Sequence, residues 1–134
     1  MVEMVEFELV SPERLLLSER AEMVVIPGVE GDFGVLPQHA PLLSTIRPGV
    51  IDVYNKGNIT ERIFVAGGFA EVTETTCTVL AEEAIPLDAL TRSMAEQRLS
   101  AAKAALDEAE TPLARAEAET SIAVAEAMLV ASAI

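Results

Sequence analysis

The residues that most often carry chemistry are scarce in this chain, and they form no recognisable constellation. His39 is the only histidine among 134 residues, so no second histidine supports a metal site, and no acid–histidine–nucleophile arrangement is legible around it. Gly67-Gly68 is too short for a phosphate-binding loop and has no lysine after it. We therefore predict no catalytic residue and no metal ligand, and we interpret Gly67-Gly68 as a bulge or a close backbone approach.

Two further candidates also have a structural interpretation. Glu82-Glu83 has the composition of a metal-binding pair, but the position after an apolar run favours a solvated strand end. Cys77 alternates with Val79 and Ala81 on one strand face, which predicts a buried and unreactive thiol. The single cysteine excludes an internal disulfide and, with no basic leader at the N-terminus, favours a cytoplasmic protein.

The net charge of −13 narrows the classes of partner. Nucleic acid and an anionic membrane surface would both repel the chain, so we expect neither nucleic-acid binding nor direct lipid insertion. Acidic residues or glycines interrupt every apolar run, so no transmembrane segment is predicted. Half of the residues are apolar and few are aromatic, so Val, Leu, Ile and Met must fill the core.

The amino-acid composition, and with it the kind of secondary structure that must position these residues, changes near Pro86. All seven glycines precede Pro86, whereas residues 87–134 contain none and are rich in alanine. We expect an α+β protein in which residues 1–86 form an antiparallel β-sandwich or barrel and residues 87–134 form an antiparallel helical hairpin. The predicted strands are 5–9, 22–26, 50–54, 59–66, 69–72 and 77–81.

Two apolar stripes at helical spacing support the hairpin. The stripes consist of Ala95, Leu99, Ala102 and Leu106, and of Ala118, Ile122, Ala125 and Leu129. Asp88 is placed to cap the first helix, and Thr111, followed by Pro112 at the first helical position, is placed to cap the second. Because alanine buries little area, we expect the hairpin to be the weaker half of the molecule.

The stretch 31–49 contains three glycines, three prolines and His39, without a helical or strand rhythm. Prolines fix φ and withhold their N–H groups from a sheet, so we predict a stiff loop between strands, pinned to the core by Leu36, Leu42 and Leu43. Rigid surface loops of this length often carry recognition. His39 is then either a residue that braces the loop or part of an interface.

Three segments carry a resemblance to a known family: IPGVEGDFGVLPQHAPLLSTIRPGVIDV, FVAGGFAEV and TVLAEEAI. Together with a sandwich followed by an alanine-rich helical pair, they resemble the epsilon subunit of the rotary proton-driven ATP synthase, which is called delta in mitochondria. The resemblance covers the whole chain, by letter in residues 5–86 and by architecture in residues 87–134. It implies a noncatalytic rotor subunit at the foot of the central stalk, on the cytoplasmic face of the bacterial inner membrane.

The resemblance also implies partners and contact residues. The sandwich is expected to bind the gamma subunit and the polar loops of the membrane-embedded c-ring, and to help pass torque between the ring and the catalytic head. The turn Glu30-Gly31-Asp32 is expected to face the ring, where the carboxylates would form charge-assisted hydrogen bonds with basic and amide groups. The neighbourhood that faces gamma is expected to include Ser11, His39 and Ser44.

Some members of the family bind ATP through an Asp followed three residues later by Arg-Ala at the start of the first helix. Here Arg92 comes four residues after Asp88, and Ser93 stands in place of the alanine. The Asp88 and Arg92 side chains would share a helix face and form an i,i+4 ion pair, so they make a weak nucleotide site at most. We therefore expect no cofactor.

Other members inhibit ATP hydrolysis through an extended C-terminal helix that engages an acidic segment of the alpha/beta catalytic head. Such a contact favours basic residues, but residues 87–134 carry four basic against eight acidic side chains, and none beyond Arg115 is basic. We expect inhibition by this hairpin to be weak. Without the resemblance, the residues fit a soluble β-sandwich interaction or ligand-sensing module with a regulatory helical hairpin.

Overall fold

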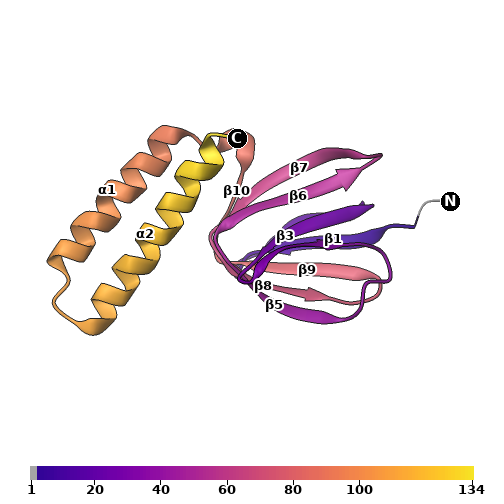
Figure 1. Cartoon of the computed structure of the whole chain (residues 1–134), viewed down its shortest axis with the longest axis horizontal. Helices are drawn as coiled ribbons and strands as arrows, with labels where there is room; N and C mark the ends of the chain where they lie inside the picture. Colours follow the sequence, from indigo (N-terminus) through magenta and orange to yellow (C-terminus); the bar gives the residue numbers. More distant parts are fainter. Residues whose placement is uncertain (1–2) are drawn as a thin grey trace. The chain divides into compact units, whose positions relative to one another are not determined.

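The computed structural model of this chain describes residues 3–134. It divides into two compact units, the first ending at Pro86 and the second running Leu87–Ile134. The strands lie in the first unit and the two α-helices in the second (Figure 1). The fold class predicted from the sequence, a β-sandwich followed by a helical hairpin, is confirmed.

One curled sheet builds the sandwich. The strand order is β10-β7-β6-β3-β5-β8-β9-β1-β2, and β4 pairs with β3 off this path. The strands are β1 (Val5–Val10), β2 (Leu15–Ala21), β3 (Met23–Gly28), β4 (Gly31–Val35), β5 (Leu42–Ile46), β6 (Gly49–Asn55), β7 (Asn58–Val65), β8 (Gly68–Val72), β9 (Thr76–Ala81) and β10 (Ala84–Pro86). Neighbours run antiparallel except β1 and β9, which run parallel, so the sheet is mixed rather than purely antiparallel.

Strand β3 joins the two layers of the sandwich. Its first residues, from Met23 to Val25, pair with β6, whereas Gly28 pairs with β5. The sheet can therefore fold over along β3, which brings the apolar faces of the two layers together. The core lies between those faces.

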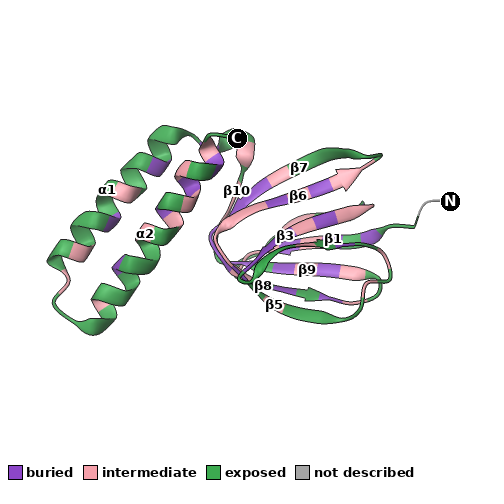
Figure 2. Ribbon diagram, viewed as in Figure 1, coloured by how far each residue is buried: buried purple, intermediate pink, exposed green. Residues whose placement is uncertain are grey.

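Period-two alternation explains which residues reach the core. Val5, Phe7 and Leu9 of β1 are at most 2% exposed, while the residues between them are exposed or half-buried. Figure 2 shows the same banding on neighbouring strands. Because alternate side chains point to opposite sheet faces, such a strand presents one dry and one wet face. Cys77 on β9 is fully buried, as predicted.

The prediction of one long loop over residues 31–49 is wrong. The segment contains β4, which pairs with β3, and β5, which pairs with β8. Pro41 and Pro48 lie just outside the bounds of β5, so neither removes a hydrogen bond from that strand. Leu42 is 38% and Leu43 is 69% exposed, so these side chains do not pin the segment to the core.

Leu36 is 53% exposed, so its side chain does not pin the segment to the core either. Strands β2 and β10 were not predicted either. In β2 the alternation is interrupted, because exposed Leu15 is followed by two half-buried leucines and only Ala21 is fully buried. Sequence periodicity indicates a strand only when one of its faces is clearly buried.

Backbone conformations that favour glycine occur in several turns of the sandwich, among them the β6–β7 turn and the start of β8. The β6–β7 hairpin turns through Lys56 and Gly57, with φ values of 54° and 76°. At Gly68 a Cβ atom would lie 1.9 Å from the carbonyl oxygen of Leu80, which no real side chain could tolerate. The close backbone approach predicted at Gly67-Gly68 is therefore confirmed.

The second unit consists of a short 3-10 turn, η1 (Leu87–Ala89), and helices α1 (Arg92–Glu108) and α2 (Pro112–Ser132). Both predicted stripes are confirmed, because their alanines are buried and their larger members are half-buried. These alanines are Ala95, Ala102, Ala118 and Ala125. In residues 3–134, no helix has both the length and the apolar character needed to cross a membrane.

One of the two predicted helix caps is confirmed. The Thr111 hydroxyl accepts a hydrogen bond from the Ala114 backbone N–H at 3.0 Å, and Pro112 is the first residue of α2. The cap predicted for α1 is wrong, because Thr91 performs that role. Asp88 lies in η1, which ends at Ala89 and is separated from Thr91 by Leu90.

Candidate functional site

The turn between β3 and β4, where the resemblance implies a ring contact, is a tight hairpin. Gly28 pairs with Gly31, so Val29 and Glu30 form the exposed tip. Gly31 has φ of 133°, and a Cβ atom at Gly28 would lie 2.8 Å from the Gly31 carbonyl oxygen. The two glycines therefore permit the turn, because a side chain at either position would be strained or would clash.

Arg47, directly after β5, holds this turn from the side. Its Nη1 donates a hydrogen bond to the Gly28 carbonyl oxygen at 2.6 Å, and its Nη2 donates to Asp32 Oδ1 at 2.5 Å. The Arg47 backbone N–H donates to the Pro27 carbonyl oxygen at 2.9 Å. One residue therefore ties both strands of the β3–β4 hairpin to the end of β5.

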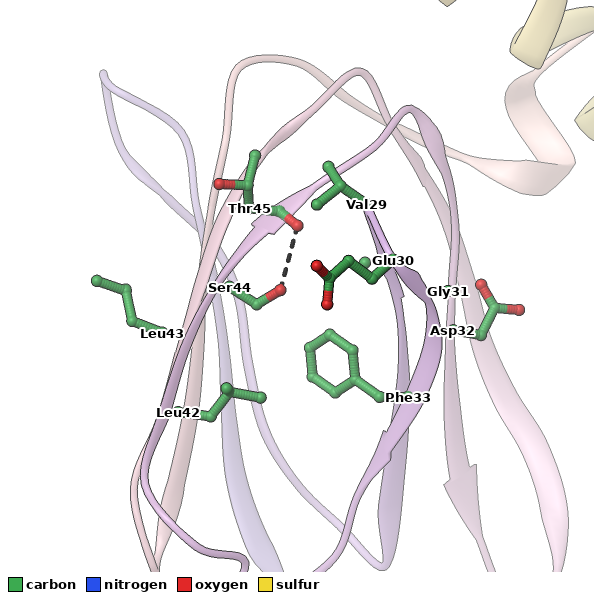
Figure 3. A pocket seen from close by; sticks show the side chains of 10 residues that line it. Val29, Glu30, Gly31, Asp32, Phe33, Leu42, Leu43, Ser44 and Thr45 are labelled. Atoms are coloured by element: carbon green, nitrogen blue, oxygen red, sulfur yellow. Dashed lines mark hydrogen bonds between the residues drawn. The ribbon is translucent and has the colours of Figure 1, made fainter.

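A recess of about 500 Å³ lies between the turn and β5. It is lined by residues of the turn and of both adjoining strands, including Phe33, Leu42 and Ser44. Figure 3 shows the Glu30 carboxylate over this recess, between Ser44 and Phe33, whereas Asp32 points away on the other side of the turn. The two predicted ring-facing carboxylates therefore do not form one acidic patch.

A row of side chains, all exposed except half-buried Val10, crosses the outer face of the sheet on β5, β8, β9, β1 and β2. Successive members face one another across neighbouring strands. This outer row consists of Thr45, Phe69, Leu80, Val10 and Leu15. Phe69 is 50% and Leu15 is 53% exposed, so the row is an apolar surface open to solvent.

The three residues expected near gamma lie in separate places. Ser11 follows β1, at the end of the sheet where the outer row crosses. Ser44 lies in the middle of β5, and its side chain turns toward the recess beside Glu30 (Figure 3). Its hydroxyl donates to the Thr45 carbonyl oxygen at 3.2 Å.

His39 lies at the opposite end of the sandwich from Ser11. The preceding residue, Gln38, donates its backbone N–H to the Glu74 carbonyl oxygen at 2.7 Å, which fixes the loop beside the β8–β9 turn. The His39 ring Nδ1 lies 2.7 Å from the Ala40 carbonyl oxygen. This contact braces the loop locally and leaves the rest of the half-buried ring for other contacts.

The ion pair predicted between Asp88 and Arg92 does not form. The Arg92 Nε donates to Glu96 Oε1 at 2.7 Å, because Glu96 lies one turn further along α1 while Asp88 lies outside that helix. Arg92 also borders a recess of about 390 Å³ lined by the end of α2, including Leu129 and Val130. That lining is largely apolar, which suits an aliphatic group better than a phosphate.

Two groups in the described part of the sandwich have shifted pKa values. Burial raises the pKa of the Cys77 thiol to about 12, so this thiol stays protonated and unreactive at neutral pH. Desolvation, and secondly the charge of Glu61, raise the pKa of Glu19 above its usual value. Residues 3–134 hold no group of three or more His, Cys, Asp or Glu side chains that could bind a metal ion, the neighbourhood of Glu82-Glu83 included.

Sequence reasoning missed two residues of interest, Arg47 and Glu19. Arg47 was one of several scattered basic residues, and nothing in its spacing connects it with a turn fifteen positions earlier. Glu19 lies on a strand that the sequence did not predict. A weak signal for Arg47 was available, because it stands directly before Pro48-Gly49, in the short link between β5 and β6.

Both the sandwich and the full chain are similar to known proteins. A family profile described as "ATP synthase, Delta/Epsilon chain, beta-sandwich domain" matches residues 4–87. The ATP synthase epsilon chain of Rhodospirillum rubrum is 60% identical over 131 residues, which cover 98% of each chain. That of Paramagnetospirillum magneticum is 56% identical over 133 residues, covering 99% of this chain and 100% of the relative.

Solved structures share the fold. A chain in the Euglena gracilis mitochondrial ATP synthase has a TM-score of 0.79 at 23% identity, covering 96% of this chain and 81% of that one. A chain in the central stalk and c-ring of the Tetrahymena thermophila enzyme has a TM-score of 0.71 at 14% identity, covering 96% of both. With the sandwich profile matched and two relatives alike from end to end, this chain belongs to the family of ATP synthase epsilon chains.

Proposed function

We propose that this chain is a noncatalytic subunit of the central stalk of a proton-translocating ATP synthase, where it helps couple proton flow to ATP synthesis. The observation that carries the proposal is the 60% identity with an ATP synthase epsilon chain over 98% of both sequences. Structures with the same fold come from an assembly that contains F1 and the c-ring and from one of the central stalk and the c-ring, which supports a place in the rotor.

The sandwich unit is proposed to bind gamma through the outer row and the residues at its two ends. Phe69 and Leu80 are 50% and 36% exposed, and covering such side chains stabilises a complex by about 25 cal/mol per Å² of apolar surface. Ser11 lies at one end of this face and the His39 loop at the other, whereas the Ser44 side chain lies on the opposite face of β5, toward the recess. A gamma contact that includes all three would therefore also have to reach the recess side of β5.

The β3–β4 turn is proposed to meet the polar loops of the c-ring. Its tip is exposed and acidic, and its backbone is fixed by Gly28, Gly31 and Arg47. A rigid contact suits torque transfer, because a flexible turn would absorb part of each rotation. These contacts would hold the subunit peripherally at the cytoplasmic face of the inner membrane, with the helices free to reach the alpha/beta head when extended.

The gamma contact is tested with Phe69→Glu, which adds a charge to the outer row. We expect its affinity for purified gamma to fall at least tenfold, about 1.4 kcal/mol, because the charge would be buried against an apolar partner. Ile59→Glu is the matched control, since Ile59 is an exposed apolar residue on β7, away from this face. Equal gamma binding by both variants and the wild type would show that the outer row is not the gamma surface.

The coupling role is tested with Gly31→Val in epsilon-depleted ATP synthase rebuilt on stripped membranes. The wild-type chain should restore ATP-driven proton pumping, whereas Gly31→Val should restore less than about half, because a branched residue cannot hold a φ near 133° without strain. Gamma binding should be unchanged in the variant. If the wild-type chain restores no pumping and binds neither gamma nor the ring, the proposed function is wrong.

A further inference from the structure

Within residues 3–134, three strands of the sheet pair with a neighbour on one side only: β2, β4 and β10. The free side of such a strand presents unpaired backbone N–H and C=O groups, on which a strand of another chain can pair. β10 has only three residues and ends in Pro86, and β4 contains two glycines, so neither is a good template for pairing. β2 is longer, with seven residues, and begins with three leucines. The free edge of β2 is therefore the one that most needs protection.

Glu19 is a charged residue on the core-facing side of this edge strand. It stands opposite Phe7 in the β1–β2 register, and Phe7 is fully buried. Directly opposite residues of an antiparallel pair share one sheet face, so Glu19 points to the core side, as do Leu17 and Ala21. Its Oε1 atom is buried and has no hydrogen-bond partner among the described residues. A carboxylate in this position weakens the fold, so stability does not account for its presence.

We propose that the inward-facing carboxylate of Glu19 protects the free edge of β2 from pairing with a second copy of this chain, and that Asn55 covers one end of the same edge. In the single chain, Glu19 lies at the margin of the sheet, and its side chain is only half-buried. A strand paired beside β2 would place the carboxylate inside a continuous sheet, away from water and among apolar side chains. Because burying an unpaired charge is strongly unfavourable, this pairing is disfavoured.

The Asn55 side chain covers the end of β2 where the chain passes into β3. Its Oδ1 accepts a hydrogen bond from the Glu22 backbone N–H at 3.2 Å, and its Nδ2 donates to the Arg20 carbonyl oxygen at 3.5 Å. The side-chain amide therefore takes the place that a peptide group of a neighbouring strand would occupy. Backbone groups of alternate residues point to the same edge of a strand, so those of Ser18 also point to this edge. No strand of the described chain pairs with them, which leaves the middle of β2 to the protection of Glu19.

Glu61 on β7 provides a second inward-facing carboxylate nearby. It stands opposite Val53, which is fully buried, so it also points to the core side of the sheet. β10 pairs with β7 only from Ile63 to Val65, so the edge of β7 at Glu61 has no strand beside it in the described chain. Desolvation, and secondly the charge of Glu61, raise the pKa of Glu19, which indicates that the two carboxylates lie close together. A strand inserted beside β2 would therefore meet two negative charges.

The experiment compares the self-association of the full chain and its variants by sedimentation equilibrium. We expect Glu19→Val to self-associate at least about tenfold more tightly than the wild type, because the charge that opposes pairing is gone. Hydrogen exchange should show new protection of the β2 amides in the associated form, since those groups would then be paired. Ser18→Val is the matched control. It adds the same side chain at the adjacent exposed residue on the other sheet face and should leave the β2 amides unprotected.

Two further variants separate the inward charge from other properties of Glu19 and Asn55. Glu19→Lys should self-associate no more than the wild type, because an ammonium group opposes burial as a carboxylate does. Asn55→Ala in the Glu19→Val background should tighten association further, since the end of the edge is then open as well. If Glu19→Val associates like the wild type, or if Glu19→Lys associates as tightly as Glu19→Val, the inference is wrong. Unchanged association on adding Asn55→Ala would overturn the role of Asn55.

Thermal unfolding distinguishes pairing of folded chains from aggregation of unfolded ones. Glu19→Val should melt cooperatively at or above the wild-type temperature, because a buried carboxylate without a hydrogen bond has been removed. Glu19→Thr, which is uncharged and also favours strands, replaces it in every measurement if Glu19→Val is insoluble. Association that appears only where cooperative unfolding is lost, or that leaves the β2 amides unprotected, would overturn the inference. The inference concerns the chain by itself, so its failure would leave the proposed function standing.

Discussion

At the scale of single residues, the surroundings of Glu19 disfavour the ionised form of its carboxylate. Its Oε1 atom is buried and accepts no hydrogen bond from the described residues, and Glu61 adds a second negative charge nearby. Both effects disfavour the ionised carboxylate, so the pKa of Glu19 is raised in the folded chain. Protonation then favours folding, because the folded state binds the proton more tightly than the unfolded state.

Replacing Glu19 with Gln should therefore stabilise the protein near pH 7. The stability that protonated Glu19 contributes is fully present below the unfolded pKa of this group and is lost as pH rises through its higher folded pKa. Over that interval the free energy of unfolding of the variant should therefore rise relative to that of the wild type. The gain should be roughly half a kcal/mol, discounted because the carboxyl is partly open to solvent. Urea unfolding at pH 4 and pH 7 measures it. Glu13→Gln, at an exposed turn position, is the control, and an equal gain there would contradict the prediction.

The sequence predicts the role of a residue whose type has one dominant physical property. It does not predict the role of a residue that depends on which groups lie near it in the folded chain. Cys77 was predictable because its strand alternates, and Gly68 because two adjacent glycines mark a close approach. Arg47 could not be assigned, since its role depends on where the Gly28 carbonyl oxygen and Asp32 fall in space. The turn proposed to face the ring was located by resemblance, but the opposite directions of its carboxylates depend on how the β3–β4 hairpin lies against β5.

At the scale of elements, predictions succeeded where hydrophobic periodicity was strong. β1, β9 and both helix stripes have regular buried positions, and the sequence indicated all of them. β4 and β5 were missed because β4 contains two glycines and β5 exposes three of its five residues. Main-chain pairing with neighbouring strands holds such segments, and single-sequence patterns do not report that pairing.

The charge of the hairpin leads to a prediction about regulation. Glu117, Glu119 and Glu126 of α2 are all exposed, and α2 has no basic residue after Arg115. Docking against an acidic segment of the catalytic head would bring like charges together, each contact costing several tenths of a kcal/mol. Deleting residues 87–134 should therefore raise ATP hydrolysis of the assembled complex by less than about threefold.

Replacing the three glutamates of α2 with Lys should strengthen inhibition of ATP hydrolysis in the same assay. Lysines at three exposed positions of α1 form the control, because they change net charge without altering α2. These positions are Gln97, Ser100 and Ala104. If deletion raised ATP hydrolysis tenfold, or if the α2 lysines left it unchanged, charge would not be what limits the binding of α2 to the catalytic head.

At the scale of the whole molecule, the two units differ in how they are stabilised. The buried apolar cluster of the sandwich draws all of its members from residues 5–81. The hairpin relies on alanine contacts, which bury little surface for each residue ordered. The sandwich therefore has a core of its own.

A chain truncated after Pro86 should consequently fold by itself and bind gamma with an affinity within about threefold of the full chain. Calorimetry should show one cooperative transition, since a small domain with a single core usually unfolds in two states. Residues 87–134 alone should show a weaker and broader transition. An insoluble or unfolded sandwich fragment would mean that the helices complete its core.

The parallel pairing of β1 with β9 has a consequence for the order in which the chain acquires its structure. Val10 lies opposite Leu80, so the first strand meets its neighbour only after seventy further residues have been synthesised. Until then β1 and β2 form a hairpin with an unpaired edge, and β8 and β9 must arrive together to cover it. Distant pairings of this kind slow folding, whereas the contacts of α1 with α2 are local. We therefore expect the sandwich to close on the ribosome only once β9 has emerged, and the helices to form afterwards, on the order of microseconds for short helical segments.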